Sequence, residues 1–160
     1  MPDLTKTGID GLDEILNGGI VSNSTTLLSG PPGAGKSVLG LRYVYNGVEQ
    51  FDERGVYLTF EEDGTDLRGA AESLGFDNWQ QYVETGQIQV YDKQVLLREN
   101  DFNASLELLL EELDGEDYQR LVLDSLSMFG LFFDEERERR TYLLKFLDIL
   151  SENGLTSLMT

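Results

Sequence analysis

The chain has 160 residues, and its 30 acidic residues outnumber the 12 basic ones, which gives a formal net charge of −18. Such a charge disfavours binding to nucleic acid backbones and to anionic membranes. Because the chain contains neither cysteine nor histidine, disulfides, thiolate and imidazole chemistry and the usual zinc sites are excluded, and any bound metal is a hard cation with oxygen ligands.

The first sixty residues contain apolar positions with helical spacing and apolar runs bounded by turn residues. We expect, in chain order, a short helix within residues 8–18, a buried strand at 25–29, a helix at 37–50 and a strand at 55–60. In the first of these helices, Leu12, Ile15 and Leu16 form one apolar face.

The rest of the chain continues the alternation, and its strongest helical signal is the leucine repeat within residues 106–113. We expect helices around 67–74 and 79–83, a strand at 88–91, a helix around 106–113, a strand at 121–123, a helix around 143–150 and a strand at 155–159. Strands that alternate with helices require crossover connections, which favour a parallel sheet. We therefore predict an α/β three-layer sandwich with a mainly parallel sheet, formed by residues 1–160 as a single domain.

A glycine-rich motif lies between the strand expected at 25–29 and the helix expected at 37–50. It matches G-x-x-x-x-G-K-[ST] with Gly30, Pro31, Pro32, Gly33, Ala34, Gly35, Lys36 and Ser37. Glycines let the backbone wrap around an anion, so that N–H groups and the helix N-terminus point towards it. We expect these residues and Val38 to bind a nucleotide, with Lys36 at the outer phosphates and the Ser37 hydroxyl as a Mg²⁺ ligand. The alternative is a plain strand-to-helix turn with an exposed lysine.

The strongly negative net charge does not prevent such a site. The attraction of backbone dipoles, one ammonium group and a divalent ion acts over about 3 Å, whereas acids beyond a Debye length of about 8–10 Å are screened. The local field therefore outweighs the global one.

Carboxylates follow two of the expected strands. Asp124 ends the run at 121–123, at the edge of the sheet where ligands bind in such folds, and we expect it to hold Mg²⁺ directly or through a water. Its alternative role is that of a turn former or helix N-cap. Glu61 and Glu62 follow the strand at 55–60, where one of them can polarise the water that attacks a phosphate. The alternative is that both are solvated acids, and the residues alone do not rank the two.

Two later segments have less specific patterns. Residues 128–133 are apolar and follow Asp124, and they form either a partner or subunit surface or a segment packed under a neighbouring helix. Arg137, Arg139 and Arg140 form the densest basic cluster. They are expected to pair with acids at i+3 and i+4 spacing, and the alternative is a phosphate-sensing role.

The remaining features concern the surroundings of the protein. No apolar run approaches the roughly 18 residues that a membrane span needs, and the N-terminus has no secretory pattern, so we expect a soluble, cytoplasmic protein. The acids are scattered along the chain, which suits a halophilic surface adapted to high salt. An ordinary acidic protein is the alternative.

With these residues in place, the chain resembles the KaiC-like ATPases of the RecA superfamily, which include the archaeal RadA-type proteins. The resemblance rests on TGIDGLDEILNGGI, SGPPGAGKS, the paired acids after GVYLTF, LVLDS and the ending LTSLMT, in this order. It implies a RecA-like P-loop NTPase fold that binds ATP and Mg²⁺. Residues 30–37 would surround the phosphates, Asp124 would lie at the metal, and Glu61 and Glu62 would occupy the catalytic glutamate position. Thr160 would sense the phosphate.

The chain departs from these relatives in two places. Residues 21–24 read Val-Ser-Asn-Ser where a proline and a glycine are common, which we interpret as a loop variation. The sequence also stops at Thr160, whereas the relatives continue with strands whose basic residues reach a neighbouring subunit's nucleotide. We therefore expect a core truncated at its C-terminus, with slow turnover.

The leading hypothesis is a Mg²⁺-dependent ATPase with a regulatory or signalling role. The alternative is a nucleotide-dependent binding module that does not hydrolyse ATP, with residues 128–133 as its surface for a protein partner or for a homo-oligomer. A DNA recombinase shares the same core, but the net charge of −18 and the lack of a basic stripe disfavour it.

Overall fold

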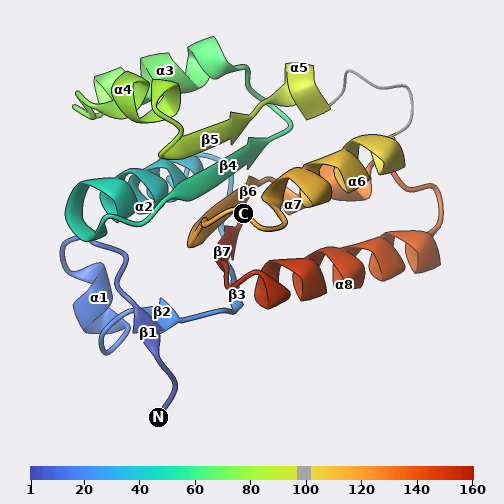
Figure 1. The fold of residues 1–160 in the computed structure, drawn as a ribbon, viewed down its shortest axis with the longest axis horizontal. Coiled ribbons are helices and arrows are strands. Elements are labelled where there is room, and N and C mark those ends of the chain that lie inside the picture. Colours follow the sequence, from blue (N-terminus) through green and yellow to red (C-terminus); the bar gives the residue numbers. More distant parts are fainter. Residues whose placement is uncertain (97–101) are drawn as a thin grey trace.

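The computed structural model describes residues 1–96 and 102–160, and a five-stranded sheet forms its centre (Figure 1). In spatial order the strands are β3 (Thr25–Leu27), β7 (Thr156–Met159), β6 (Arg120–Asp124), β4 (Gly55–Thr59) and β5 (Ile88–Tyr91). All neighbouring strands run parallel. The strands β4, β6 and β7 are buried along their whole length, as expected for parallel strands covered on both faces.

Helices cover both faces of this sheet (Figure 1). One face carries α2 (Lys36–Phe51), α3 (Gly64–Ser73) and α4 (Trp79–Glu84), and the other carries α5 (Lys93–Leu96), α6 (Phe102–Leu113), α7 (Leu126–Gly130) and α8 (Glu136–Glu152). Side chains of β4 alternate between the two layers, because Tyr57 packs on the α2 side while Val56 and Leu58 pack on the other. The predicted three-layer α/β sandwich with a parallel sheet is confirmed. Within the described residues, no helix combines the length and the hydropathy needed to cross a membrane.

Helix α2 lies close to the sheet because two of its glycines face β6. A Cβ atom on Gly40 would lie 2.9 Å from Cγ1 of Val122, and one on Gly47 would lie 2.6 Å from Cδ of Arg120. Both distances are shorter than real Cβ contacts allow. The missing side chains therefore set the distance between the helix and the strand.

The N-terminal part forms a small separate layer, which contains the short helix expected within residues 8–18. The strands β1 (Leu4–Thr5) and β2 (Ile20–Val21) pair antiparallel, and α1 (Leu12–Ile15) lies between them in the chain. The apolar face of this helix does not pack into the core, since Ile15 is 77% exposed and no residue of α1 is buried. Asp13 accepts hydrogen bonds from the N–H groups of Thr7 and Gly8, so this segment is held mainly by polar contacts.

One correction concerns the strand expected at 25–29. The structure limits β3 to Thr25–Leu27 and places it at the edge of the sheet, paired with β7 on one side. Leu27 is 61% exposed, so the strand is not buried as its apolar sequence suggested. The helices α5 and α7 were not expected, because four or five residues are too few to show a helical period.

The apolar segment 128–133 packs mostly inside the molecule. Phe129 and Phe133 are buried beside Phe146 of α8, and Met128 and Phe132 pack against the same cluster. Leu131 is the exception, with 73% of its surface exposed. Packing against a neighbouring helix, one of the two interpretations of this segment, therefore accounts for most of its apolar side chains.

Arg120 joins the N-terminal layer to the sheet from the first position of β6. Its guanidinium is fully buried and donates hydrogen bonds to the carbonyls of Lys6 at 2.6 Å and Tyr43 at 2.9 Å. It also pairs with Glu53 at 3.3 Å and lies over the Tyr43 ring, with Cζ 4.6 Å from the centroid. One cation thus satisfies carbonyls from two distant parts of the chain.

We predict that Arg120→Ala lowers the free energy of unfolding by about 3–5 kcal/mol, because it leaves buried carbonyls and Glu53 without their donor. Urea unfolding followed by circular dichroism measures this loss. The control is Arg68→Ala, which removes an exposed pair with Glu72 and is expected to lower stability by less than about 0.5 kcal/mol. Equal losses in the two variants would contradict the role assigned to Arg120.

Candidate active site

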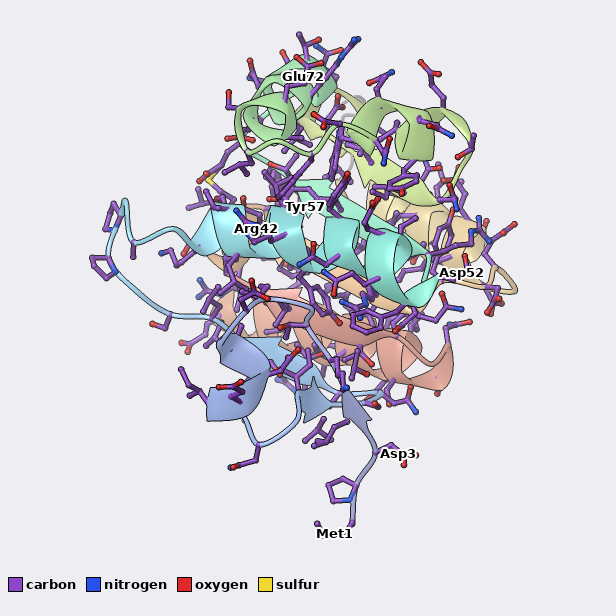
Figure 2. The ribbon with its side chains drawn as sticks, turned by 90° about the vertical axis from the view of Figure 1, so that its left-hand side faces the viewer. Met1, Asp3, Arg42, Asp52, Tyr57 and Glu72 are labelled. Carbon is purple, nitrogen blue, oxygen red and sulfur yellow. The ribbon has the colours of Figure 1, made fainter. Side chains whose placement is uncertain are left out.

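The motif residues 30–37 comprise a loop after β3, exposed at 31–35, and the first two residues of α2, Lys36 and Ser37. Gly33 and Gly35 have φ angles of 82° and 95°, a left-handed conformation that a residue with a side chain adopts only under strain. Gly35 is the N-cap of α2, and the first turn of this helix contains no acidic residue. The free N–H groups of that turn and the positive end of the helix dipole therefore face the loop, which suits an anion. The loop projects beyond the start of α2 (Figure 2), and Val38 follows on the first turn, 40% exposed.

The Lys36 side chain folds back over this loop. Its ammonium group donates a hydrogen bond of 2.7 Å to the carbonyl of Gly30, so the charge lies within the loop. The ion pairs within the described residues do not include Lys36. A positive charge is therefore held beside the free N–H groups of α2 without a carboxylate partner.

Asp124 lies beneath the loop and accepts three hydrogen bonds. Its Oδ2 accepts from the hydroxyls of Ser37 at 2.7 Å and Tyr57 at 3.1 Å, and its Oδ1 accepts from the Thr160 hydroxyl at 2.8 Å. The carboxylate is only 5% exposed, so these donors replace the water that a charged group would otherwise need. The structure thus brings together Ser37, Asp124 and Thr160, as expected. The N-cap of α7 is Ser125, and not Asp124.

Tyr57 is a contact that the sequence analysis missed. It stands within the apolar run of β4, where an aromatic residue is an ordinary strand residue. Its relation to Asp124 depends on the pairing of β4 with β6, which places Thr59 opposite Asp124 and Tyr57 opposite Val122. Only that register could have revealed the contact.

Glu61 and Glu62 follow β4 and differ in their surroundings. The Thr59 hydroxyl accepts hydrogen bonds from both of their backbone N–H groups at 3.3 Å, which turns the chain at the strand end. Glu61 is exposed, whereas Glu62 is half-buried. Burial raises the pKa of Glu62, and the negative charge of Asp124 raises this pKa further. The two glutamates are therefore distinguishable: Glu62 is the one coupled to the Asp124 carboxylate.

A cavity of about 510 Å³ adjoins the loop on the side of α7 and α8. Its lining includes Gly30, Lys36, Thr160 and Arg139. The expected pairing of the arginine cluster with acids is not found, since the ion pairs of residues 1–96 and 102–160 include none of Arg137, Arg139 and Arg140. Arg139 takes a different position, because its side chain lies over Gly130, where the missing Cβ leaves room for it. From there Arg139 lines the cavity.

The oxygen donors at this site fit a magnesium ion that is bound together with a nucleotide. Among the described residues, no group of three or more acidic side chains is placed to hold a metal by itself. One carboxylate and one hydroxyl, from Asp124 and Ser37, meet beneath the glycine loop instead. Mg²⁺ is commonly held by one or two protein ligands together with phosphate oxygens and water, and this donor set matches that pattern.

A strand, a glycine loop and a helix, with an acidic residue at the end of a nearby parallel strand, define the class of P-loop proteins, and the strand order is that of a RecA-like sheet. A model of the KaiC ATPase family matches residues 5–160, and the chain therefore belongs to the KaiC family.

Its relatives include complete clock proteins and smaller archaeal ones. The circadian clock oscillator protein KaiC of Prochlorococcus marinus is 32% identical over 160 residues, which are 96% of this chain and 32% of that protein. A UPF0273 protein of Pyrococcus furiosus is 31% identical, over 96% of this chain and 66% of that protein. The crystal structure of a KaiC-like protein from Pyrococcus horikoshii has a TM-score of 0.85 and 34% identity, and the match covers 100% of this chain and 70% of that one. The chain thus spans about a third of the length of the KaiC proteins.

The raised pKa of Glu62 predicts a small gain in stability when its charge is removed. A carboxyl group whose pKa is higher in the folded state opposes folding when it is ionised, and this effect disappears as the pH falls below its unfolded pKa. We expect Glu62→Gln to raise the melting temperature by about 1–2 °C near neutral pH, with the difference shrinking as the pH is lowered towards about 4. Differential scanning calorimetry of Glu62→Gln and of the exposed control Glu61→Gln measures both effects. An equal or larger gain in Glu61→Gln would contradict the coupling of Glu62 to Asp124.

Proposed function

We propose that the chain binds ATP together with Mg²⁺ and hydrolyses the γ-phosphate slowly, in a regulatory or signalling role. The observation that carries this proposal is the contact between Ser37, in the first turn of α2 after the glycine loop, and Asp124, which ends strand β6. Such a contact is expected where a hydroxyl and a carboxylate share one metal ion. Membership of the KaiC family of ATPases supports the same activity.

In this proposal the loop residues 30–37 bind the phosphates through their backbone N–H groups, and Val38 continues the contact on the first turn of α2. Lys36 exchanges its hydrogen bond to the Gly30 carbonyl for one to the outer phosphates. Ser37 and Asp124 hold the Mg²⁺, which neutralises charge on the phosphate oxygens. Thr160 keeps the orientation of Asp124 through its hydrogen bond to Oδ1, and it senses the phosphate from the lining of the cavity that it shares with Lys36.

We assign the activation of water to Glu62. A general base needs a pKa raised towards neutrality and a position near the reacting phosphate. Glu62 combines a raised pKa with proximity to Asp124, whereas its neighbour Glu61 is exposed. As the pH is lowered, the rate of ATP hydrolysis is therefore expected to begin to fall at a higher pH than it would with an ordinary glutamate as the base. The reason is that only the ionised form of Glu62 acts as the base.

A second candidate function is a nucleotide-dependent binding module without turnover. The observation that favours it is the exposure of Leu131, at 73%, on the segment that directly follows Asp124 and α7. Only Ser125 and α7 separate Asp124 from Leu131 in the chain, so a shift of Asp124 on nucleotide binding would be transmitted to Leu131 through this short helix. ATP-dependent association with no phosphate release above background would favour this function over hydrolysis.

A phosphate-release assay with purified variants tests hydrolysis. We expect Glu62→Gln to lower the rate by about 10²-fold or more, since general-base contributions are typically of that size. Lys36→Ala is expected to abolish both the binding of the nucleotide and the release of phosphate. Glu61→Gln serves as the matched control and is expected to retain most of the rate. Equal phosphate release by the wild type and all three variants would show that the activity does not come from this site.

A further inference from the structure

The hydroxyl of Tyr57 reaches the Asp124 carboxylate across two strands of the sheet. Tyr57 lies opposite Val122 in the β4–β6 pairing, and Asp124 lies two residues farther along β6, so all three side chains point to the face covered by α2. A diagonal pair of this kind is within reach of a long aromatic side chain. The hydroxyl donates a hydrogen bond of 3.1 Å to Oδ2 of Asp124.

The ring of Tyr57 is held in this position by its surroundings. It is 0% exposed and lies under α2, which Figure 2 shows passing beside it. A Cβ atom on Gly40 would lie 3.6 Å from Cε2 and 3.8 Å from the hydroxyl oxygen of Tyr57. Gly40 is one turn away from Ser37 on the same helix. The packing that fixes the ring therefore also fixes its distance from the proposed nucleotide site.

Two hydroxyls donate to the same oxygen of Asp124, and they have different tasks in the proposed site. The Ser37 oxygen can ligate a metal through a lone pair while its hydroxyl hydrogen stays directed at Oδ2 of Asp124. The Tyr57 hydroxyl approaches from within the core, between β4 and α2, where it has no access to a nucleotide in the loop. Its hydrogen bond restricts the rotation of the carboxylate and leaves the remaining lone pairs of Asp124 for the metal or its water.

We propose that Tyr57 is a positioning residue for the magnesium–nucleotide complex, acting through its hydrogen bond to Asp124. This inference rests on the proposed function, since it assigns a role in the same site. A ring that merely filled the core would serve nearly as well without its hydroxyl, because phenylalanine keeps the ring and its apolar contacts. The two roles therefore differ in what happens when only the oxygen atom is removed.

The test is the Mg²⁺ dependence of equilibrium binding of a fluorescent ATP analogue to the wild type and to Tyr57→Phe. We expect the variant to need about tenfold more Mg²⁺ for half-maximal binding, a typical effect of losing a hydrogen bond to a metal ligand. Its affinity for the analogue in the presence of EDTA is expected to equal that of the wild type. Phenylalanine preserves the ring, and thermal unfolding checks that the variant is folded.

Two controls sharpen the test. Tyr43→Phe removes another fully buried hydroxyl, which donates to the carbonyl of Thr156 at 2.8 Å, away from the loop, and should leave the Mg²⁺ dependence unchanged. In an Asp124→Asn background, Tyr57→Phe should cause no further tenfold shift, because a residue that acts through Asp124 has nothing left to position.

The outcomes separate this inference from the proposed function. If the wild type binds the analogue without any dependence on Mg²⁺, the proposed function is wrong and the role of Tyr57 is wrong with it. If the wild type depends on Mg²⁺ and Tyr57→Phe shows the same dependence, only the positioning role is wrong. Equal weakening of binding with Mg²⁺ and with EDTA would also overturn it, because that result indicates a general structural effect.

Discussion

The arrangement of the whole site depends on keeping one buried carboxylate hydrogen-bonded. Asp124 is 5% exposed, and an ionised group removed from water to this extent is tolerated only with several good donors. Its donors come from the start of α2, from the middle of β4 and from the residue after β7. The correct order and register of the central strands is therefore also the condition for forming the site, so that folding and preorganisation of the site are the same event.

The two end residues of strand β6 both contact α2 and hold it in place. Its last residue, Asp124, accepts a hydrogen bond from Ser37 in the first turn of the helix. Its first residue, Arg120, donates to the carbonyl of Tyr43 and fills the space opposite Gly47. A buried anion and a buried cation at the two ends of this five-residue strand thus hold the helix against the sheet, while Gly40 between them permits close approach. Because the loop leads directly into α2, these contacts also determine the position of the loop.

The sequence was sufficient for features that local pattern determines. The runs at β4, β5 and β6, the period of α2 and the motif at 30–37 gave the fold class, and parallel strands placed Asp124 near Ser37. Long-range pairing was not visible, and so the contact of Tyr57 with Asp124 and the burial of Arg120 were missed. The exposure of β3 was missed for the same reason, because an apolar strand at the edge and one in the centre look alike in sequence. The distinction between Glu61 and Glu62 needed the direction of the chain after Thr59.

The hydrogen bond between Lys36 and the Gly30 carbonyl has a consequence for binding in so acidic a chain. A lysine surrounded by carboxylates commonly forms an ion pair, and a phosphate then has to compete with an anion that is already in place. In the proposed nucleotide binding, the competitor is instead the neutral carbonyl of Gly30 in the loop itself, and a phosphate displaces it without separating opposite charges. An acidic exterior is therefore compatible with the proposed phosphate site, because Lys36 is hydrogen-bonded to a carbonyl and its positive charge is not neutralised.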